Sequence, residues 1–185
     1  MIQRQLFVRI NKIPVEDKLR ELKQQVLSQM VRVRGVVTKR TAILAKLWQA
    51  TFRCTKCGMR KGPIVVTEEL NDIGLCSLCQ APGPFSIDET QTYYSNFQRV
   101  TLQEPPQDVP AGRMPRHKTV ILTHDLVDKV KPGDQVIVTG VYLNQYSPGQ
   151  NATSGIPLFD TLIEANHVEK IGELQEGAVT NNDRE

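Results

Sequence analysis

The feature that most constrains this chain is its set of four cysteines, which stand as two close pairs. The first pair is Cys54 and Cys57, the second is Cys76 and Cys79, and the chain has no other cysteine. A gap of two residues lets both thiolates of a pair turn toward one point, and a longer connection brings the second pair round to complete a tetrahedron. This spacing predicts a structural site for one Zn²⁺ ion per chain.

Two disulfides, or four small buried apolar side chains, are the alternatives to a metal centre at these positions. Nothing in the sequence indicates a secreted chain, and two symmetric pairs seldom arise by chance, so the zinc interpretation is favoured. Gly58 follows the first pair, where a tight turn often requires a residue that can adopt positive φ. Because four thiolates leave no open coordination position, the metal is expected to shape the fold and not to catalyse.

Charge is distributed unevenly along the 185 residues, although the formal net charge is only +3. Residues 1–60 contain 14 Lys and Arg against 3 Asp and Glu, whereas residues 61–185 contain 9 against 17. Such an asymmetry indicates a surface for an anionic polymer, and for a nucleic acid in particular. The alternative is local compensation, in which four cations neutralise the formal charge of −2 on a zinc ion with four thiolates: Arg53, Lys56, Arg60 and Lys61.

Hydropathy and cysteine chemistry limit where such a chain works. No apolar run approaches the ~20 residues of a membrane span, and no signal peptide precedes the amphipathic start. Reduced cysteines fit the cytosol or the nucleus. We therefore expect no membrane partner, and with a nucleic acid as the expected partner we predict a nuclear protein.

A change of apolar period divides the chain into a helical start and a β-rich remainder. Pro14 opens a helical pattern with apolar residues at spacings of four, three and four, which predicts an amphipathic helix that reaches Val26. Alternating apolar residues then predict strands over residues 31–37, 47–53, 92–104, 119–123, 135–143 and 161–168, and a short strand over 63–67.

The order of these segments predicts a mainly β fold, namely a five-stranded OB-fold barrel with an inserted four-cysteine zinc-binding subdomain and a short N-terminal helix. Gly35 interrupts the apolar face of the first strand and indicates a bulge or a barrel-closing bend. An SH3-like barrel or a two-layer α+β sheet would give a similar order of strands. The expected limits are 1–29 for the N-terminal strand and helix, 30–53 with 92–171 for the barrel, 54–91 for the zinc insert and 172–185 for a linker or tail.

Several motifs resemble the N-terminal domain of the minichromosome maintenance (MCM) replicative helicases, and together they cover nearly all of residues 7–170. The most specific is the succession of Gln-Glu-Pro, Pro-Ala-Gly, Pro-Arg and Pro-Gly-Asp between Gln103 and Asp134. Among the family's members the chain is most similar to the second subunit of the eukaryotic heterohexamer. This resemblance rests on four features: Cys57 followed by Gly62-Pro63, Ala81-Pro-Gly-Pro-Phe85, Gly140-Val-Tyr142 and Ile163-Glu-Ala-Asn-His-Val168.

The resemblance implies a non-catalytic scaffold domain that forms a hexameric ring around single- or double-stranded DNA with other MCM subunits. It implies roles in the initiation of DNA replication and in fork unwinding, with head-to-head contact through the zinc insert. The parent protein would be an ATP-dependent DNA helicase, whereas these residues contain no phosphate-binding G-x-x-x-x-G-K-[ST] loop. Residues 1–29 would then be the remnant of an upstream helical subdomain.

The same resemblance implies roles for two loops. The proline-rich loop after residue 103 resembles the family's communication loop to the ATPase tier, and its marker residues are Gln103, Glu104, Gly112, Pro115 and Arg116. Judged from its prolines alone, this loop is stiff, and a surface crossover is the alternative to a functional role. Residues 144–157 take the place of a hairpin that points into the channel, but they contain no Lys or Arg. We therefore expect little DNA contact from that hairpin.

The expected DNA contacts lie in the basic N-terminal third of the chain. Arg32 and Arg34 alternate with apolar residues, so both are expected on the solvent face of the first strand. Lys39, Arg40 and Lys46 follow, in what is expected to be the loop where OB folds often bind oligonucleotides.

Two other functional classes are weaker alternatives. A zinc deaminase requires H-x-E followed by P-C-x-x-C, but the H-x-E that begins at His167 follows the cysteines, and no proline precedes either pair. A free-standing zinc-containing OB-fold protein that binds single-stranded nucleic acid would read bases through an aromatic platform. Aromatic residues make up only 5% of this chain, which favours contact with the phosphate backbone instead.

Overall fold

The computed structural model describes residues 6–65, 73–146 and 159–172, and these residues form strands joined by turns and short 3-10 helices. The strands are β1 (Met30–Arg40), β2 (Leu44–Cys54), β3 (Arg60–Val65), β4 (Phe85–Ile87), β5 (Tyr93–Gln103), β6 (His117–Thr123), β7 (Gln135–Tyr146) and β8 (Phe159–Lys170). The 3-10 helices are η1 (Gln24–Val26), η2 (Glu89–Gln91), η3 (Pro106–Asp108) and η4 (His124–Leu126). No helix within these ranges is long and apolar enough to cross a membrane.

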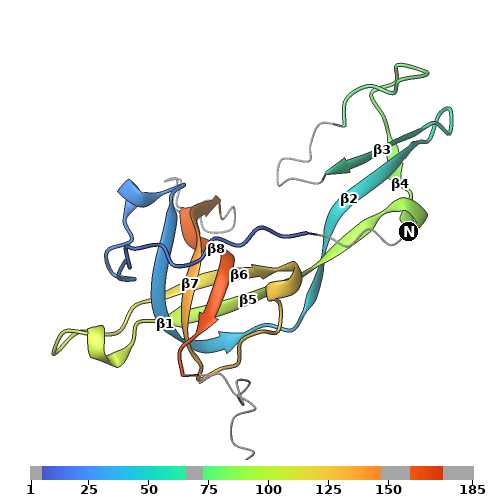
Figure 1. The fold of residues 1–185 in the computed structure, drawn as a ribbon. Coiled ribbons are helices and arrows are strands. Elements are labelled where there is room, and N and C mark those ends of the chain that lie inside the picture. The colour runs from blue at the N-terminus through green and yellow to red at the C-terminus, as the bar shows by residue number, and fades with distance from the viewer. Residues whose placement is uncertain (1–5, 66–72, 147–158, 173–185) are drawn as a thin grey trace, which may run out of the picture. The chain divides into compact units, whose positions relative to one another are not determined.

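The chain divides into two compact units. The first, called the ring unit below, comprises residues 1–42 and 98–185, of which the described parts include β1, β6, β7, β8 and β5 from Gln98 onward. The second, called the cysteine unit, comprises residues 43–97 and contains β2, β3, β4 and the first part of β5 (Figure 1). The cysteine unit is thus an insertion within the ring unit's sequence.

Five strands pair in a closed ring in the ring unit. The neighbours follow the order β1, β7, β8, β6 and β5, and β5 pairs again with β1 (Figure 1). β6 and β8 are parallel, whereas β1 is antiparallel to both of its neighbours. This closed, mainly β arrangement agrees with the predicted OB fold.

Burial along β1 explains why this segment is a strand. Its residues alternate between buried and more exposed positions, with Val31, Val33 and Val37 on the buried side. These valines join a core that includes Leu102 of β5, Leu122 of β6, Tyr142 of β7 and Ile163 of β8. The predicted period of two is therefore confirmed, because one side of the strand faces the apolar interior of the ring.

Gly35 and Gly140 allow neighbouring strands to approach closely. A Cβ atom on Gly35 would lie 2.4 Å from Cγ of Leu102, and one on Gly140 would lie 2.2 Å from the carbonyl oxygen of Glu164. The register shift in β1 falls between Val37 and Lys39 and not at Gly35. Of the predicted alternatives, a bulge or a barrel-closing bend, the bulge does not occur at Gly35, and this glycine makes room for a side chain of the facing strand.

The helix predicted to run from Pro14 to Val26 is wrong, since only the 3-10 helix η1 forms there. The amide of Asp17 donates to the carbonyl of Arg32 (2.7 Å), and this pairing with β1 replaces helical hydrogen bonds. The apolar pattern nevertheless identified two core residues correctly, because Leu19 and Leu22 are buried against the ring. Tertiary pairing has overridden the local preference.

The predicted strands agree with observed strands, most of which are longer than predicted, whereas β4 has no predicted counterpart. Each predicted strand of the ring overlaps an observed one. The predicted hairpin at 144–157 falls only partly within the described residues. Its first residues belong to β7, and residues 147–158 lie outside the described ranges.

Candidate metal centre and basic surface

The first cysteine pair forms a tight turn directly after β2. Cys54 is the last residue of that strand, and its carbonyl accepts a hydrogen bond from the amide of Gly58 (2.9 Å). The amide of Cys54 in turn donates to the carbonyl of Met59 (2.8 Å). Gly58 has φ +72°, so the positive φ expected at this position is confirmed.

The second pair repeats this hydrogen-bond pattern. The amide of Gln80 donates to the carbonyl of Cys76 (3.0 Å), and the amide of Cys76 donates to the carbonyl of Ala81 (2.9 Å). Gln80 takes the place of the glycine and has φ +54°, a conformation that is uncommon for a residue with a side chain. Both turns therefore have the same geometry although only one of them contains the expected glycine.

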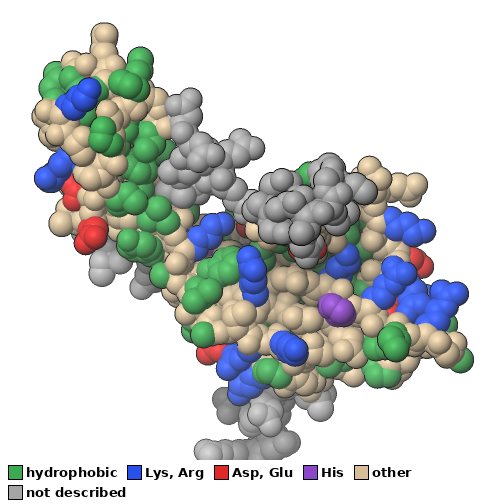
Figure 2. All heavy atoms as spheres, turned by 180° about the vertical axis from the view of Figure 1, so that it is seen from behind, with side chains coloured by type: hydrophobic (Ala, Val, Ile, Leu, Met, Phe, Trp, Pro, Cys, Tyr) green, Lys and Arg blue, Asp and Glu red, His purple; other side chains and the backbone are tan. Residues whose placement is uncertain are grey.

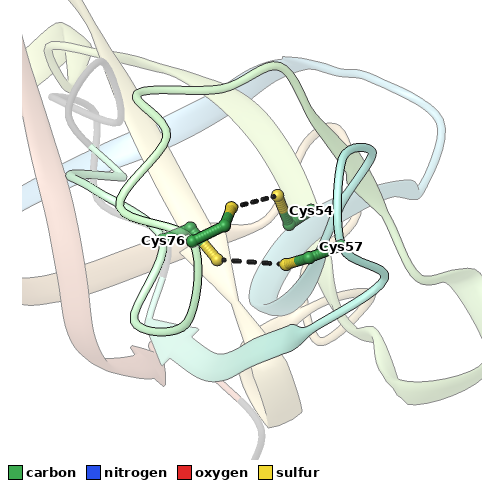
Figure 3. A group of neighbouring side chains, drawn as sticks. Cys54, Cys57 and Cys76 are labelled. Carbon is green, nitrogen blue, oxygen red and sulfur yellow. Dashed lines mark hydrogen bonds between the residues drawn. The ribbon is translucent and has the colours of Figure 1, made fainter.

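The four sulfur atoms gather around one point. Sγ of Cys54 lies 3.7 Å from Sγ of Cys79, Sγ of Cys57 lies 3.5 Å from Sγ of Cys76, and all four lie within 4.8 Å of one another (Figure 3). All four cysteines are free, which excludes the disulfide alternative in this structure. A tetrahedral site with metal–sulfur bonds of about 2.3 Å has sulfur–sulfur distances of roughly 3.8 Å. This cluster could therefore hold a metal ion.

Backbone amides donate to the sulfur atoms of Cys54, Cys57 and Cys76, and these hydrogen bonds favour the thiolate form. Hydrogen bonds from the amides of Cys79 and Leu78 lower the pKa of Cys76 to about 6, and amides of Cys57 and Lys56 lower the pKa of Cys54. The amide of Met59 acts in the same direction on Cys57, but burial and the neighbouring thiols raise the pKa of Cys57 to about 12. Backbone groups thus stabilise thiolates, the ionisation state that binds a metal.

Asp88 holds two of the cations that were candidates for neutralising the metal centre. Its buried carboxylate pairs with Arg53 at 3.2 Å and with Arg60 at 3.1 Å. A hydrogen bond from the Thr90 hydroxyl, with help from the Thr90 amide and both arginines, lowers the pKa of Asp88. The ammonium group of Lys61 donates to the backbone carbonyls of Ile73 and Leu75.

The N-terminal segment engages both arginines that were predicted on the solvent face of β1. Arg32 donates through Nη1 to the carbonyl of Ile13 (2.9 Å), and Arg34 pairs with Glu16 at 3.0 Å. Arg34 keeps much of its side chain exposed, at 46%. Arg32 is half-buried, because residues 13–17 lie across this part of the strand.

The three remaining predicted contacts lie on strands and not in a loop. Lys39 and Arg40 end β1, whereas Lys46 lies in β2 of the cysteine unit, opposite Ser95. Arg40 pairs with Asp128. Lys39 and Lys46 are exposed, and neither forms an ion pair with any residue in the described ranges.

The proline-rich loop is closed at its base by a buried ion pair. Glu104 is 1% exposed and accepts two hydrogen bonds from Arg20, at 2.8 and 2.7 Å. The amide of Glu104 donates to the carbonyl of Arg116 (2.9 Å), and the amide of Arg116 donates to the carboxylate of Glu104 (3.2 Å). The Arg20 hydrogen bonds hold the pKa of Glu104 below its usual range.

The other marker residues of this loop are placed differently. Gln103 ends β5, whereas Gly112, with φ +76°, and the exposed Pro115 lie in the part that faces solvent. The loop therefore has a fixed base and an exposed tip.

Residues 18–146 match the family described as the MCM OB domain. This match covers more than half of the chain. The chain belongs to the MCM family.

Curated relatives agree with this assignment. DNA replication licensing factor MCM2 of Arabidopsis thaliana is 42% identical over 94% of this chain, and that of Schizosaccharomyces pombe is 45% identical over 92%. The Drosophila melanogaster MCM2 is 46% identical over 89%, whereas an MCM4 of Xenopus tropicalis is 30% identical over 77%. The predicted resemblance to the second subunit is thereby confirmed. The chain spans about a fifth of the length of these MCM2 relatives, at 19–21%.

The structure of this MCM domain also brings together basic residues that the sequence analysis missed. Arg99 of β5 and His117 and Lys118 of β6 line an open groove of about 350 Å³, together with Gln145 and the acidic Asp160. In OB folds the second and third strands form the usual surface for oligonucleotides, and in this ring those strands are β5 and β6. Lys and Arg side chains are numerous on the face of the molecule that Figure 2 shows.

Lys118 is fixed within this groove. Its ammonium group donates to the hydroxyls of Tyr142 (3.2 Å) and Thr161, and it lies 5.4 Å from the centre of the Tyr142 ring. The sequence signal for the groove was weak because its residues come from four strands that are distant along the chain. Only the outward position of His117 in an alternating strand could have indicated it.

Proposed function

We propose that this chain is the DNA-binding, ring-forming N-terminal domain of a replicative helicase subunit in the nucleus. Its parent would act in replication initiation and fork unwinding, with ATP hydrolysis performed by other residues of that parent. The match to the MCM OB domain over residues 18–146 supports this proposal, as do relatives named DNA replication licensing factors.

We propose that the cysteine cluster binds one Zn²⁺ ion through Cys54, Cys57, Cys76 and Cys79. The supporting observation is the set of four sulfur atoms within 4.8 Å of one another, with backbone amides that favour thiolates. Bound zinc would supply cross-linking of the two turns and no catalytic chemistry, because all four positions are taken by sulfur. Residues 54–91 would then act as a structural insert that is available for contact between hexamers.

We propose that DNA contacts this domain through its phosphates. The observation that carries this proposal is the basic groove on β5 and β6, at the usual OB surface of the ring unit. The exposed Lys39 and Lys46 are further candidates for phosphate contact, each within its own unit. Arg32, Arg34 and Arg40 would contribute less, since each already binds the carbonyl or carboxylate of another residue. Residues 103–116 would serve as the contact to the ATPase tier, because their base is fixed and their tip is exposed.

The salt dependence of DNA binding tests the groove. Each phosphate contact contributes roughly 0.7–0.9 to the slope of log affinity against log salt. We expect Arg99→Glu combined with His117→Glu to weaken binding to all sequences alike and to reduce that slope by about 1. The control is Lys131→Glu, which changes the charge of the same unit at an exposed position outside the groove. An unchanged slope in the double variant, or an equal change in the control, would contradict the groove as the site.

A further inference from the structure

Lys61 reaches from β3 into the turn that precedes the second cysteine pair. Its Nζ donates to the backbone carbonyl of Leu75 (3.2 Å) and to that of Ile73. Between these two carbonyls stands Gly74, on which an added Cβ would lie 3.5 Å from the same nitrogen. The ammonium group therefore binds the main chain on both sides of Gly74.

Lys61 lies between the two cysteine pairs in the sequence. Lys61 follows Cys57 by four residues, whereas the two carbonyls that it binds precede Cys76 by three residues and one residue. The backbone of Lys61 belongs to the strand that leaves the first turn, opposite Phe52 of β2. Its side chain thus links the exit of the first cysteine pair to the entrance of the second.

We propose that Lys61 is a positioning residue of the metal centre, one that holds the second cysteine pair at the first. This inference rests on the proposed binding of zinc by the cluster. Lys61 provides donors to the main chain beside Cys76, and it places a positive charge near a centre of formal charge −2. Fixing the two pairs near each other raises the effective concentration of one pair at the other.

Loss of the Lys61 side chain is expected to weaken the retention of the metal. A lysine ammonium carries three donors and no acceptor, so two carbonyls of one turn can be bound at the same time. Without these bonds the entrance of the second pair would lose a fixed attachment to β3. Outer groups that orient metal ligands typically change metal affinity by about 10–100-fold when they are removed. We expect the lower end of that range, because Lys61 acts on the backbone and not on a ligand side chain.

Lys56 offers a matched control. It lies between Cys54 and Cys57, is exposed, and its side chain makes no hydrogen bond or ion pair with residues of the described ranges. Lys56→Met and Lys61→Met remove the same charge close to the cluster. Only the second substitution removes the bonds to the turn.

The experiment compares the rate of zinc release to an excess of a chromogenic chelator in the 185-residue protein. Zinc is first counted in the unsubstituted protein, since a stoichiometry of zero contradicts the proposed metal site itself. We expect Lys61→Met to release zinc about tenfold faster and Lys56→Met to stay within about twofold of the unsubstituted protein. The visible spectrum of the Co²⁺-substituted variant should still indicate four sulfur ligands, which separates faster release from loss of the ligand set.

Two results would overturn the role of Lys61 while leaving zinc binding intact. One is an unchanged rate of zinc release in Lys61→Met. The other is equally faster zinc release in Lys56→Met and Lys61→Met, because loss of a positive charge alone would then explain the effect. If Lys61→Met retains no metal, Lys61→Arg decides the matter, because it keeps the charge and donors. Restored metal binding in Lys61→Arg supports the role, and absent binding contradicts it.

Discussion

The ring unit and the cysteine unit have different sources of stability. The ring unit encloses a continuous apolar core to which all five of its strands contribute. The cysteine unit buries few apolar side chains in its described part, namely Ala50, Phe52, Ala81, Cys54 and Cys76. Since two of these five are metal-ligand candidates, burial alone gives the second unit little stability.

The apolar side chains of the cysteine unit are distributed differently from those in the core of the ring. Large apolar side chains of the cysteine unit point outward, such as Leu75 at 59% exposure and Leu78 at 67%, and Figure 2 shows apolar side chains gathered on that unit. The same unit contains the buried carboxylate of Asp88, which pairs with two half-exposed arginines. A chain segment too short for a core can be held by a metal ion, which is the role proposed for Zn²⁺ in this unit.

The comparison predicts that metal removal has the largest effect and that it affects only one unit. Structural zinc contributes about 10–16 kcal/mol in small domains, as much as the whole stability of many proteins. We expect Cys76→Ser, or a strong chelator, to unfold the cysteine unit and to leave the ring intact. Hydrogen exchange should show lost protection at the amides of Gly58 and Gln80. Equal loss of protection in β7 and β8 would contradict the separation of the units.

A substitution in the core of the ring tests whether the cysteine unit depends on the ring. Its expected effect on stability is smaller than that of metal removal. Leu102 is fully buried in the ring, and Leu102→Ala should lower the free energy of unfolding of that unit by about 3 kcal/mol. Metal content should not change, because the core of the ring contains none of the cysteines. Urea unfolding and metal analysis of the same sample check both statements. Leu78→Ala is the control, and it should change stability by less than about 0.5 kcal/mol.

The smallest predicted effect concerns the buried ion pair at the base of the proline-rich loop. Glu104→Gln should cost about 2 kcal/mol at neutral pH, because Arg20 loses its charged partner. The folded-state pKa of Glu104 is lowered, so its contribution is present above the unfolded pKa near ~4.3 and is lost as pH falls through the folded value.

The difference in unfolding free energy between variant and unsubstituted protein should therefore shrink in acid. Denaturation curves between neutral and acidic pH measure it. The matched control is Glu16→Gln, which breaks the exposed pair with Arg34 and should cost less than about 0.5 kcal/mol. A difference for Glu104→Gln that grows in acid would contradict the assigned direction of the shift.

Sequence patterns predicted the parts of this molecule that local spacing determines. The cysteine pairs and the alternation in β1 carry their geometry within a few residues, and both were predicted correctly. The segment after Pro14 was predicted to be helical because Leu19 and Leu22 have helical spacing, yet pairing with β1 decided its structure. The groove of Arg99 and its neighbours depends on which strands lie side by side, and no local pattern contains that information.

The pairing of Thr41 with Arg99 has a consequence for the architecture of related chains. Their backbones form a hydrogen bond (2.9 Å), the Thr41 hydroxyl accepts a second from the Arg99 amide (3.0 Å), and Gln98 donates a third to the Thr41 carbonyl (2.9 Å). These hydrogen bonds join the two ends of the 43–97 insertion inside the ring unit, and they offset the entropic cost of closing that long loop. A designer could replace the whole insertion with a short turn between Thr41 and Gln98. Natural variants could likewise lengthen or shorten it while the register of the ring stays unchanged.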